Sequence, residues 1–416
     1  MRGGEQAEPA SPNPPRRTRP AETSSIALSL WRCAYWKKEV WTIYRVEVSE
    51  VRVAVKVSVL VGEMVEMGGS DLHVKAGTFP AVRVSGRLVR LEQHGKLRPP
   101  DTEGILSEIL PEKSSEEFQT QGEADFSYAI EGVGRFRVNA FRQRGSVSIV
   151  MRFVPFDIPA IDDLGLPEAV KTLAKEERGI ILVTGTTGSG KSTTLAAMID
   201  LVNRTEARHI VTIEDPIEFL HRDRESLINQ REVGADTASF ARALRRVLRQ
   251  DPDIILIGEI RDTESAQIAL SAAETGHLVL STLHTVDATE TINRMIDLFP
   301  SHERDQARIM TAGTLKGVIG QRLIPAKDGG RVPAVEVMTA TGRIRDFILD
   351  PEKTGQIQDA IGEGEYYGMQ TYDQALLKLI EADKIEYAEA LRAASQPQNF
   401  RLMVQALGLN RRTEAG

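Results

Sequence analysis

The chain has 416 residues, of which 41% are hydrophobic, and this length is typical of two or three domains with buried cores. Its formal net charge of −7 does not favour a nucleic-acid partner. The single cysteine, Cys33, excludes an intrachain disulfide and a multi-cysteine zinc site. Because no apolar run approaches the roughly eighteen residues of a membrane span, we expect a soluble, cytoplasmic protein.

The first fifty residues are expected to lie outside the folded domains. Residues 1–24 are rich in proline, arginine, serine and threonine, a composition that buries little apolar surface. Arg16-Arg17 precedes a short apolar run at 26–30, a weak form of an export signal. Because no small-residue cleavage site follows that run, we favour a disordered extension over residues 1–50.

Residues 51–154 have the pattern of a small α+β domain. Apolar and polar residues alternate with a period of two, as in half-buried strands, at 71–74, 81–84, 126–129, 135–141 and 147–153. A helix is expected at 101–110, whereas the apolar stretch 51–65 fits either a strand or a helix. This combination predicts a sheet with helices packed on one side.

A linker that contains three prolines, at 155–170, is expected to separate this domain from a different pattern at 171–342. The strands expected there are 180–183, 209–213, 254–257 and 277–282, and the helices between them include 240–249, 263–273 and 288–298. This order predicts an α/β domain with an open, mostly parallel sheet and helices on both faces. Residues 343–416 are expected to be mainly helical.

The most specific motif lies in the stretch 179–194, GIILVTGTTGSGKSTT. It fits G-x-x-x-x-G-K-[ST], with a strand before it and a helix after it, which is the context that a phosphate-binding loop needs. Glycines let backbone N–H groups turn toward a polyphosphate, and the helix N-terminus adds further donors. We therefore favour phosphate binding over a chance glycine-rich turn. The residues expected to bind nucleotide are Gly185, Thr186, Thr187, Gly188, Ser189, Gly190, Lys191, Ser192 and Thr193.

Two acidic clusters follow later strands of the same domain. Glu214, Asp215 and Glu218 stand at the end of one strand, and Glu259 follows the next, where an aspartate is more usual. The carboxyl ends of strands are the ligand-binding edge of open α/β sheets, so we expect these carboxylates to face the phosphates. The alternatives are a solvated loop and an ordinary helix-start carboxylate. With Ser192, Glu259 is the expected ligand set for Mg²⁺.

His277 and His284 bracket the last expected strand. A histidine beside an apolar strand is often only a structural hydrogen-bonding group, but two of them in a nucleotide domain are also consistent with sensing of the terminal phosphate. The two interpretations are about equally favoured. A zinc site is not expected, because no cysteine or third histidine lies nearby.

Several boxes in order resemble the bacterial secretion ATPases, and among them the PilT family of type IV pilus retraction (twitching-motility) ATPases. The resemblance covers roughly residues 52–405. The boxes are GGSDLHVKAG (68–77), RFRVNAFRQRG (135–145), VTGTTGSGKSTTLAAMID (183–200), TIEDPIEF (212–219), NQREVG (229–234), DPDIILIGEIRD (251–262), SAAETGHLVLSTLHT (271–285) and GMQTYDQAL (368–376).

This resemblance implies a PAS-like N-terminal domain, a RecA-like P-loop NTPase domain and a helical C-terminal region, with ATP and Mg²⁺ as ligands. It also implies roles for individual residues. Lys191 and Ser192 match the Walker A loop, Glu214, Asp215 and Glu218 the acidic box with Glu218 as the water-activating base, Glu259 the atypical Walker B carboxylate, and His277 and His284 the histidine box. Arginines of the N-terminal domain are implied to reach the terminal phosphate, with Arg137 and Arg152 as candidates and Arg142 behind them.

The function implied by the resemblance is that of a homohexameric motor that hydrolyses ATP to power pilus retraction. It would act in the cytoplasm at the face of the inner membrane, with an inner-membrane pilus platform protein as partner and no nucleic acid. One segment, 342–350, matches only part of the AIRNLIRE-type sequence of retraction motors. The alternatives are a pilus-extension or type II secretion ATPase, a nucleic-acid motor, and a nucleotide-gated regulator without turnover. The first normally has a longer N-terminal region and a four-cysteine motif, which this chain lacks.

Overall fold

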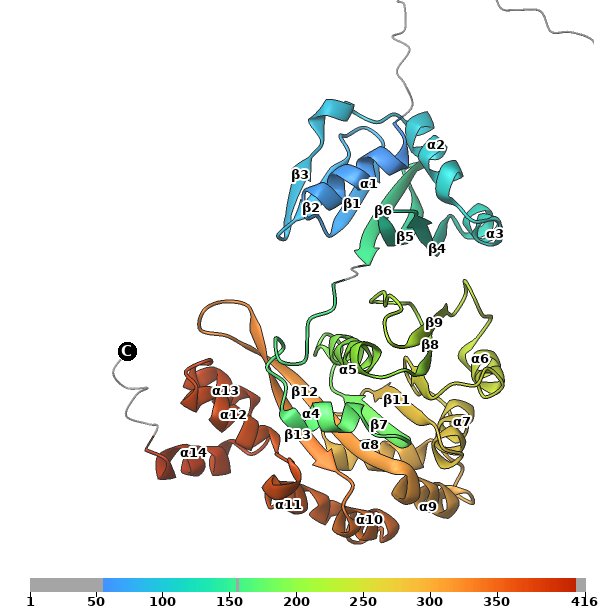
Figure 1. Cartoon of the computed structure of the whole chain (residues 1–416). Coiled ribbons are helices and arrows are strands. Elements are labelled where there is room, and N and C mark those ends of the chain that lie inside the picture. The colour runs from blue at the N-terminus through green and yellow to red at the C-terminus, as the bar shows by residue number, and fades with distance from the viewer. Residues whose placement is uncertain (1–54, 155–156, 409–416) are drawn as a thin grey trace, which may run out of the picture. The chain divides into compact units, whose positions relative to one another are not determined.

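The structure is a computed structural model, and it describes residues 55–154 and 157–408 (Figure 1). The expected extension at 1–50, together with Cys33, lies outside the described residues. None of the helices in these two ranges has the length and apolar character needed to cross a membrane.

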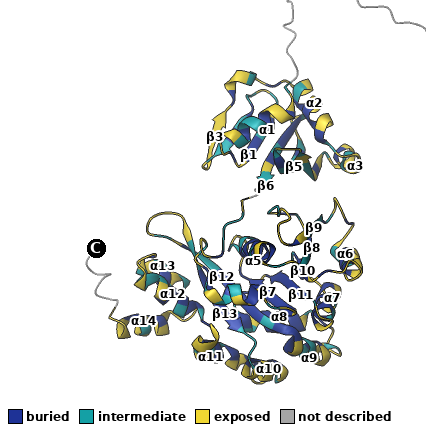
Figure 2. Ribbon diagram, viewed as in Figure 1, coloured by how far each residue is buried: buried dark blue, intermediate teal, exposed yellow. Residues whose placement is uncertain are grey.

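The N-terminal part contains a six-stranded sheet whose neighbouring strands all run antiparallel, in the order β3-β2-β1-β6-β5-β4. Its strands are β1 (Asp71–Lys75), β2 (Ala81–Val84), β3 (Arg87–Arg90), β4 (Glu123–Ile130), β5 (Gly134–Gln143) and β6 (Ser146–Val154). Alternation decides the two faces. Along β5, Phe136, Val138 and Ala140 are buried in the core, while Arg137 is exposed on the other face. Figure 2 shows how buried and exposed residues are distributed over the strands and helices.

Three helices contribute to this core: α1 (Val57–Glu66), α2 (Pro99–Ile109) and α3 (Glu112–Gln121). The apolar stretch 51–65, which fitted either a strand or a helix, contains most of the helix α1. Its four buried residues, Val57, Leu60, Val61 and Met64, have the three- and four-residue spacing of one helical face. The predicted α+β class of this part is confirmed, whereas α3 was not expected.

The larger part is built on a seven-stranded sheet in the order β13-β12-β7-β11-β10-β8-β9. All neighbouring strands run parallel except the edge strand β13, which pairs antiparallel with β12. The strands are β7 (Gly179–Thr184), β8 (His209–Glu214), β9 (Leu227–Glu232), β10 (Ile254–Ile257), β11 (Leu278–Leu283), β12 (Leu315–Pro325) and β13 (Arg331–Thr339). The predicted open, mostly parallel sheet is confirmed, and β9, β12 and β13 are additional to it.

Helices cover both faces of this sheet, and β7 shows why its sequence is apolar throughout. Ile181 and Val183 belong to the hydrophobic cluster that includes α4 (Glu168–Ala174) and α5 (Lys191–Thr205). Ile180 and Leu182 point to the opposite cluster, to which the remaining four helices of the domain contribute. Those helices are α6 (Phe240–Val247), α7 (Thr263–Glu274), α8 (Ala288–Asp297) and α9 (Arg304–Thr314). When both faces of a strand are buried, none of its side chains faces solvent, and its sequence is apolar without alternation.

The C-terminal region is helical, as predicted, but it packs in two places. The helices α10 (Gly342–Leu349) and α11 (Ile357–Gly362) contribute apolar residues to the same cluster as α6–α9. The helices α12 (Tyr372–Glu381), α13 (Tyr387–Ala393) and α14 (Pro397–Ala406) form a separate cluster with Ile324 and Ala334 of the β12–β13 hairpin. Short 3-10 turns occur at Glu92–His94, Thr354–Gln356 and Glu365–Tyr367.

Candidate nucleotide-binding site

The glycine-rich loop connects the end of β7 to the first residue of α5. Three of its glycines have a positive φ: 140° at Gly185, 78° at Gly188 and 92° at Gly190. A Cβ on Gly185 would lie 2.4 Å from the carbonyl oxygen of Gln321, and one on Gly190 would lie 2.7 Å from Nε2 of Gln321. Two of these positions therefore admit only glycine because β12 lies directly against the loop. Nothing lies within 4 Å of a Cβ on Gly188.

The loop borders a cavity of about 570 Å³. Of the residues predicted to bind nucleotide, six line it: Thr187, Gly188, Gly190, Lys191, Ser192 and Thr193. Gly185, Thr186 and Ser189 do not line it. The Lys191 ammonium donates to the carbonyl oxygens of Gly185 (2.8 Å) and Thr186 (3.1 Å), which connects the side chain to the loop. Burial lowers the pKa of Lys191, and the charges of Glu259 and Glu218 oppose that shift.

The sheet brings the two acidic clusters to the same cavity. The strands β8 and β10 pair in parallel, with Ile213 opposite Ile257, so the residues that follow them meet at one edge. Glu214, Asp215 and Glu218 line the cavity from the β8 side, and Glu259 lines it from the β10 side. The cavity therefore presents one lysine at the N-terminus of a helix opposite four carboxyl groups.

The carboxyl groups of Glu214 and Glu259 differ in their environment. Burial raises the pKa of Glu214, against the hydrogen bonds from Thr212 Oγ1 (2.6 Å) and Gln230 Nε2 (3.2 Å). Burial acts in the same direction on Glu259, but the ion pair with Arg261 (Nε to Oε1, 2.8 Å) outweighs it and lowers the pKa of Glu259. Glu259 and Ser192 line the same cavity, and carboxylate and hydroxyl oxygens are the ligands that Mg²⁺ prefers.

The two predicted histidines lie at opposite ends of β11. His284 follows the strand, lines the cavity, and has its Nε2 3.5 Å from Oε2 of Glu259. His277 precedes the strand at the end where Leu278 pairs with Gly179, the first residue of β7. Its Nδ1 lies 2.9 Å from the carbonyl oxygen of Ala272. His277 therefore does not line this cavity, and a role for it in sensing the terminal phosphate stays a prediction.

None of the three predicted arginines of the N-terminal sheet lines this cavity. Arg137 and Arg152 are cross-strand neighbours on β5 and β6, and Arg152 Nε donates to Asp71 (2.8 Å). The guanidinium of Arg142 lies over the ring of Phe118, 5.2 Å from its centre. Phosphate contact by these arginines stays a prediction.

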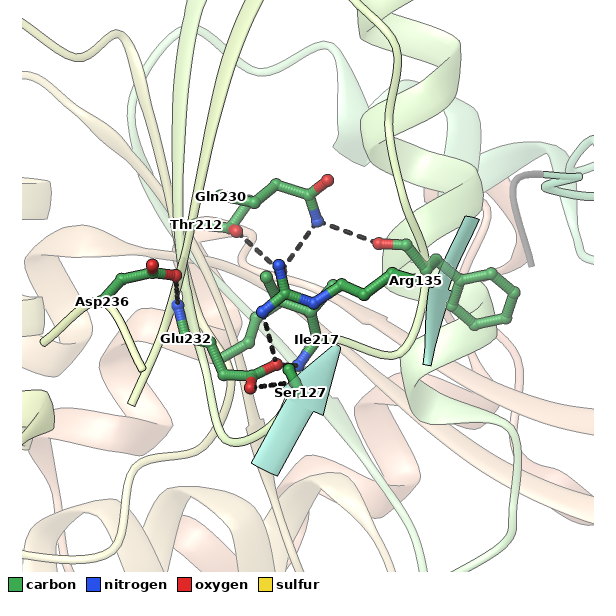
Figure 3. A network of polar contacts seen from close by, with 9 residues as sticks. Ser127, Arg135, Thr212, Ile217, Gln230, Glu232 and Asp236 are labelled. Atoms are coloured by element: carbon green, nitrogen blue, oxygen red, sulfur yellow. Dashed lines mark hydrogen bonds and ion pairs between the residues drawn. The ribbon is translucent and has the colours of Figure 1, made fainter. Parts of the chain in front are cut away.

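Arg135 was not a candidate, yet it takes part in a polar network with residues around β9 (Figure 3). Its Nη2 lies 3.3 Å from Oε2 of Glu232, and the hydroxyl of Ser127 also donates to Glu232. The Glu232 carboxylate accepts the backbone N–H of Ile217 (3.0 Å), within the acidic loop after β8. A signal for Arg135 was present in the sequence, because it stands two residues before Arg137 in the same alternating strand.

Other residues line the cavity that sequence reasoning missed: Phe219, His221, Phe240, Arg261, Leu323 and Arg331. Arg261 had a usable signal, since it stands two residues after Glu259. Leu323 and Arg331 had none, because they lie on the β12–β13 hairpin that the sequence pattern did not predict.

His221 makes the stability of this region depend on pH. Burial lowers its pKa from 6.5 to about 4, and its Nδ1 is buried without a hydrogen-bond partner among the described residues. Above pH 6.5 the ring is neutral in both states. As the pH falls from 6.5 toward 4, the unfolded chain binds the proton and the folded chain does not, so stability is lost by up to about 3 kcal/mol.

We therefore expect His221→Phe to flatten the loss of stability between pH 6.5 and 4, as measured by urea unfolding. The matched control is His302→Phe, because the His302 side chain is 79% exposed and its replacement should leave the pH profile as in the wild type. Parallel profiles for the wild type and His221→Phe would contradict this assignment.

The geometry defines a class of protein: a P-loop nucleotide-binding protein with a RecA-like sheet. The model of the type II/IV secretion system protein family matches residues 113–403. The type IV pilus retraction ATPase PilT of Pseudomonas aeruginosa is 46% identical over 335 residues, which are 80% of this chain and 97% of that protein. A twitching motility protein of Neisseria gonorrhoeae is 42% identical over 322 residues, 77% of this chain and 86% of that protein.

Among solved structures, the pilus retraction motor PilT with bound ADP is similar with a TM-score of 0.77 and 45% identity. The match covers 83% of this chain and 98% of that one. The chain belongs to the type II/IV secretion system protein family and, within it, to the PilT-type ATPases. ATP hydrolysis is the activity of this class of protein.

Proposed function

We propose that this protein is the motor ATPase of type IV pilus retraction. The observation that carries the proposal is the alignment along nearly the whole length of a retraction ATPase, and it is supported by the cavity that Lys191, Ser192, Glu218 and Glu259 line together. The match to PilT spans both the N-terminal sheet and the nucleotide-binding domain, so it concerns the whole motor and is not limited to a shared nucleotide fold.

The residues divide the chemistry among them. Lys191 and the N-terminus of α5 hold the phosphates and stabilise the charge that develops on the transferred phosphoryl group. Glu218 orients the attacking water and accepts its proton. Ser192 and Glu259 are the residues that hold Mg²⁺, which when bound neutralises charge on the phosphate oxygens. His284 senses the terminal phosphate through its place beside Glu259.

Further parts of the proposal rest on the family. The working unit is a homohexameric ring at the cytoplasmic face of the inner membrane, where it acts on a pilus platform protein. Arginines of the N-terminal domain, with Arg137 and Arg152 as the candidates, complete the site in the closed state of the ring. Closure and reopening around hydrolysis supply the movement.

The test is deletion of the gene, followed by complementation with the wild-type chain or with Lys191→Ala. Retraction predicts cells with excess pili that do not shorten and no surface motility, restored only by the wild-type chain. Cells without pili would identify an extension ATPase. DNA-stimulated hydrolysis by the purified protein would favour a nucleic-acid motor, and phosphate release at background level would indicate a regulator without turnover.

A further inference from the structure

The loop that carries His284 is continuous with the first turn of α8. After His284, three residues lead into this helix, which Asp287 caps by accepting the backbone N–H of Glu290 (2.8 Å). Within the same turn, the hydroxyls of Thr285 and Thr291 are hydrogen-bonded at 2.7 Å and both residues are buried. The position of His284 therefore depends on where α8 begins.

A carboxyl group on another strand accepts a hydrogen bond from the first residue of α8. The side chain of Glu336, on β13, is fully buried. Its Oε1 accepts the backbone N–H of Ala288, the first residue of α8 (2.9 Å). A negative group at this position also interacts favourably with the helix dipole. Glu336 does not line the nucleotide cavity and has no part in the chemistry described above.

The second oxygen of the same carboxyl group connects to the C-terminal region. Oε2 of Glu336 accepts a hydrogen bond from Nε2 of Gln358, on α11 (2.9 Å). The helix α11 also packs against α8. Burial raises the pKa of Glu336 to about 7, which the two hydrogen bonds partly offset. Burying a carboxyl group is unfavourable unless it is hydrogen-bonded, and each oxygen of Glu336 has one such partner, in α8 or in α11. An arrangement of this kind suggests that the carboxyl group has a function.

We propose that Glu336 is a positioning residue for ATP hydrolysis, which sets the His284 loop through the N-terminus of α8 and links it through Gln358 to the C-terminal helices. Side-chain contacts, together with the backbone that joins His284 to α8, connect Glu259 to Glu336 and to α11. This inference rests on the ATPase activity proposed for the cavity and does not depend on the direction in which the pilus moves.

Two replacements of Glu336 separate positioning from burial. Glu336→Met has a similar size but no acceptor, so the N–H of Ala288 loses its partner and the His284 loop is released. Glu336→Gln retains an acceptor, and the amide of Gln358 can rotate to pair with it. We expect kcat for ATP to fall about tenfold in Glu336→Met and to stay within about twofold of the wild type in Glu336→Gln.

The decisive measurement is a double-mutant cycle with His284→Ala, with kcat and KM measured in the assembled, full-length protein. If Glu336 acts through His284, Glu336→Met should have no further effect on kcat in the His284→Ala background. A merely structural role would give fold-changes that multiply. That result, or a wild-type kcat in folded Glu336→Met, would overturn the proposal.

Should Glu336→Met not fold, Gln358→Met serves in the same cycle, since it removes only the donor from α11 and leaves the pair of Glu336 with Ala288. We expect kcat to fall about threefold, again without a further effect in the His284→Ala background. An unchanged kcat, or a fall that multiplies with that of His284→Ala, would overturn the proposal. Wild-type protein that hydrolyses ATP but does not support retraction would refute only the proposed function.

Discussion

Replacing Lys191 with alanine should abolish ATP hydrolysis by this protein. Lys191 lines the cavity at the N-terminus of α5, and its ammonium also donates to the carbonyl oxygens of Gly185 and Thr186 in the loop. Its removal takes away a positive charge that opposes the charge on the phosphoryl oxygens and at the same time frees the loop. We expect kcat to fall by at least about 10²–10³-fold, as measured by phosphate release.

The matched control is Lys353→Ala. Lys353 is exposed and pairs with Asp350 (2.8 Å) in the C-terminal region, so its loss should leave hydrolysis near the wild-type rate. Circular dichroism of both variants would show that the fold is retained. Turnover at the wild-type rate in folded Lys191→Ala would remove the basis for every role assigned to this cavity.

Glu218→Gln should give a protein that binds ATP but hydrolyses it very slowly. The amide keeps the size of the side chain and loses the ability to accept a proton from the attacking water. General bases contribute about 10²–10⁴-fold, and we expect a fall in kcat of that order with little change in nucleotide affinity. Single-turnover hydrolysis and binding of a fluorescent ATP analogue measure the two quantities separately.

Glu225→Gln is the control for this experiment, because Glu225 is an exposed carboxylate seven residues further along the same connection between β8 and β9. It should behave as the wild type. If Glu218→Gln retained its rate while Glu214→Gln lost it, the base would be Glu214, whose carboxyl group also lines the cavity.

The parts of the site that the sequence predicted are those in which a strand is buried on both faces. The apolar runs of β7, β8, β10 and β11 identify these segments as buried strands, and each is followed within three residues by a residue that lines the cavity. Parallel pairing then brings these strand ends together without further information. For this reason Lys191, Glu218, Glu259 and His284 could be proposed as neighbours from the sequence.

The parts that the sequence did not predict depend on contacts between distant segments. In β12 the apolar pattern is broken by Gln321, which is buried because its side chain accepts a hydrogen bond from Thr194 of α5 (2.7 Å). Because neither β12 nor β13 was predicted, Leu323 and Arg331 could not be placed at the cavity. The place of His277 could not be predicted for a different reason: a motif names the strand but not which of its ends faces the cavity.

The parallel pairing of β7 with β11 limits what hydrolysis is able to displace. Leu283 lies opposite Thr184 across that pair, so the glycine-rich loop and His284 follow adjoining, hydrogen-bonded strands. Because a hydrogen-bonded sheet resists changes in the distance between its strands, we expect this spacing to stay nearly constant through a cycle of turnover. Movement produced by hydrolysis must therefore be transmitted through the loops that follow the strand ends. The stiffness of these loops would then help to determine the force that the motor delivers.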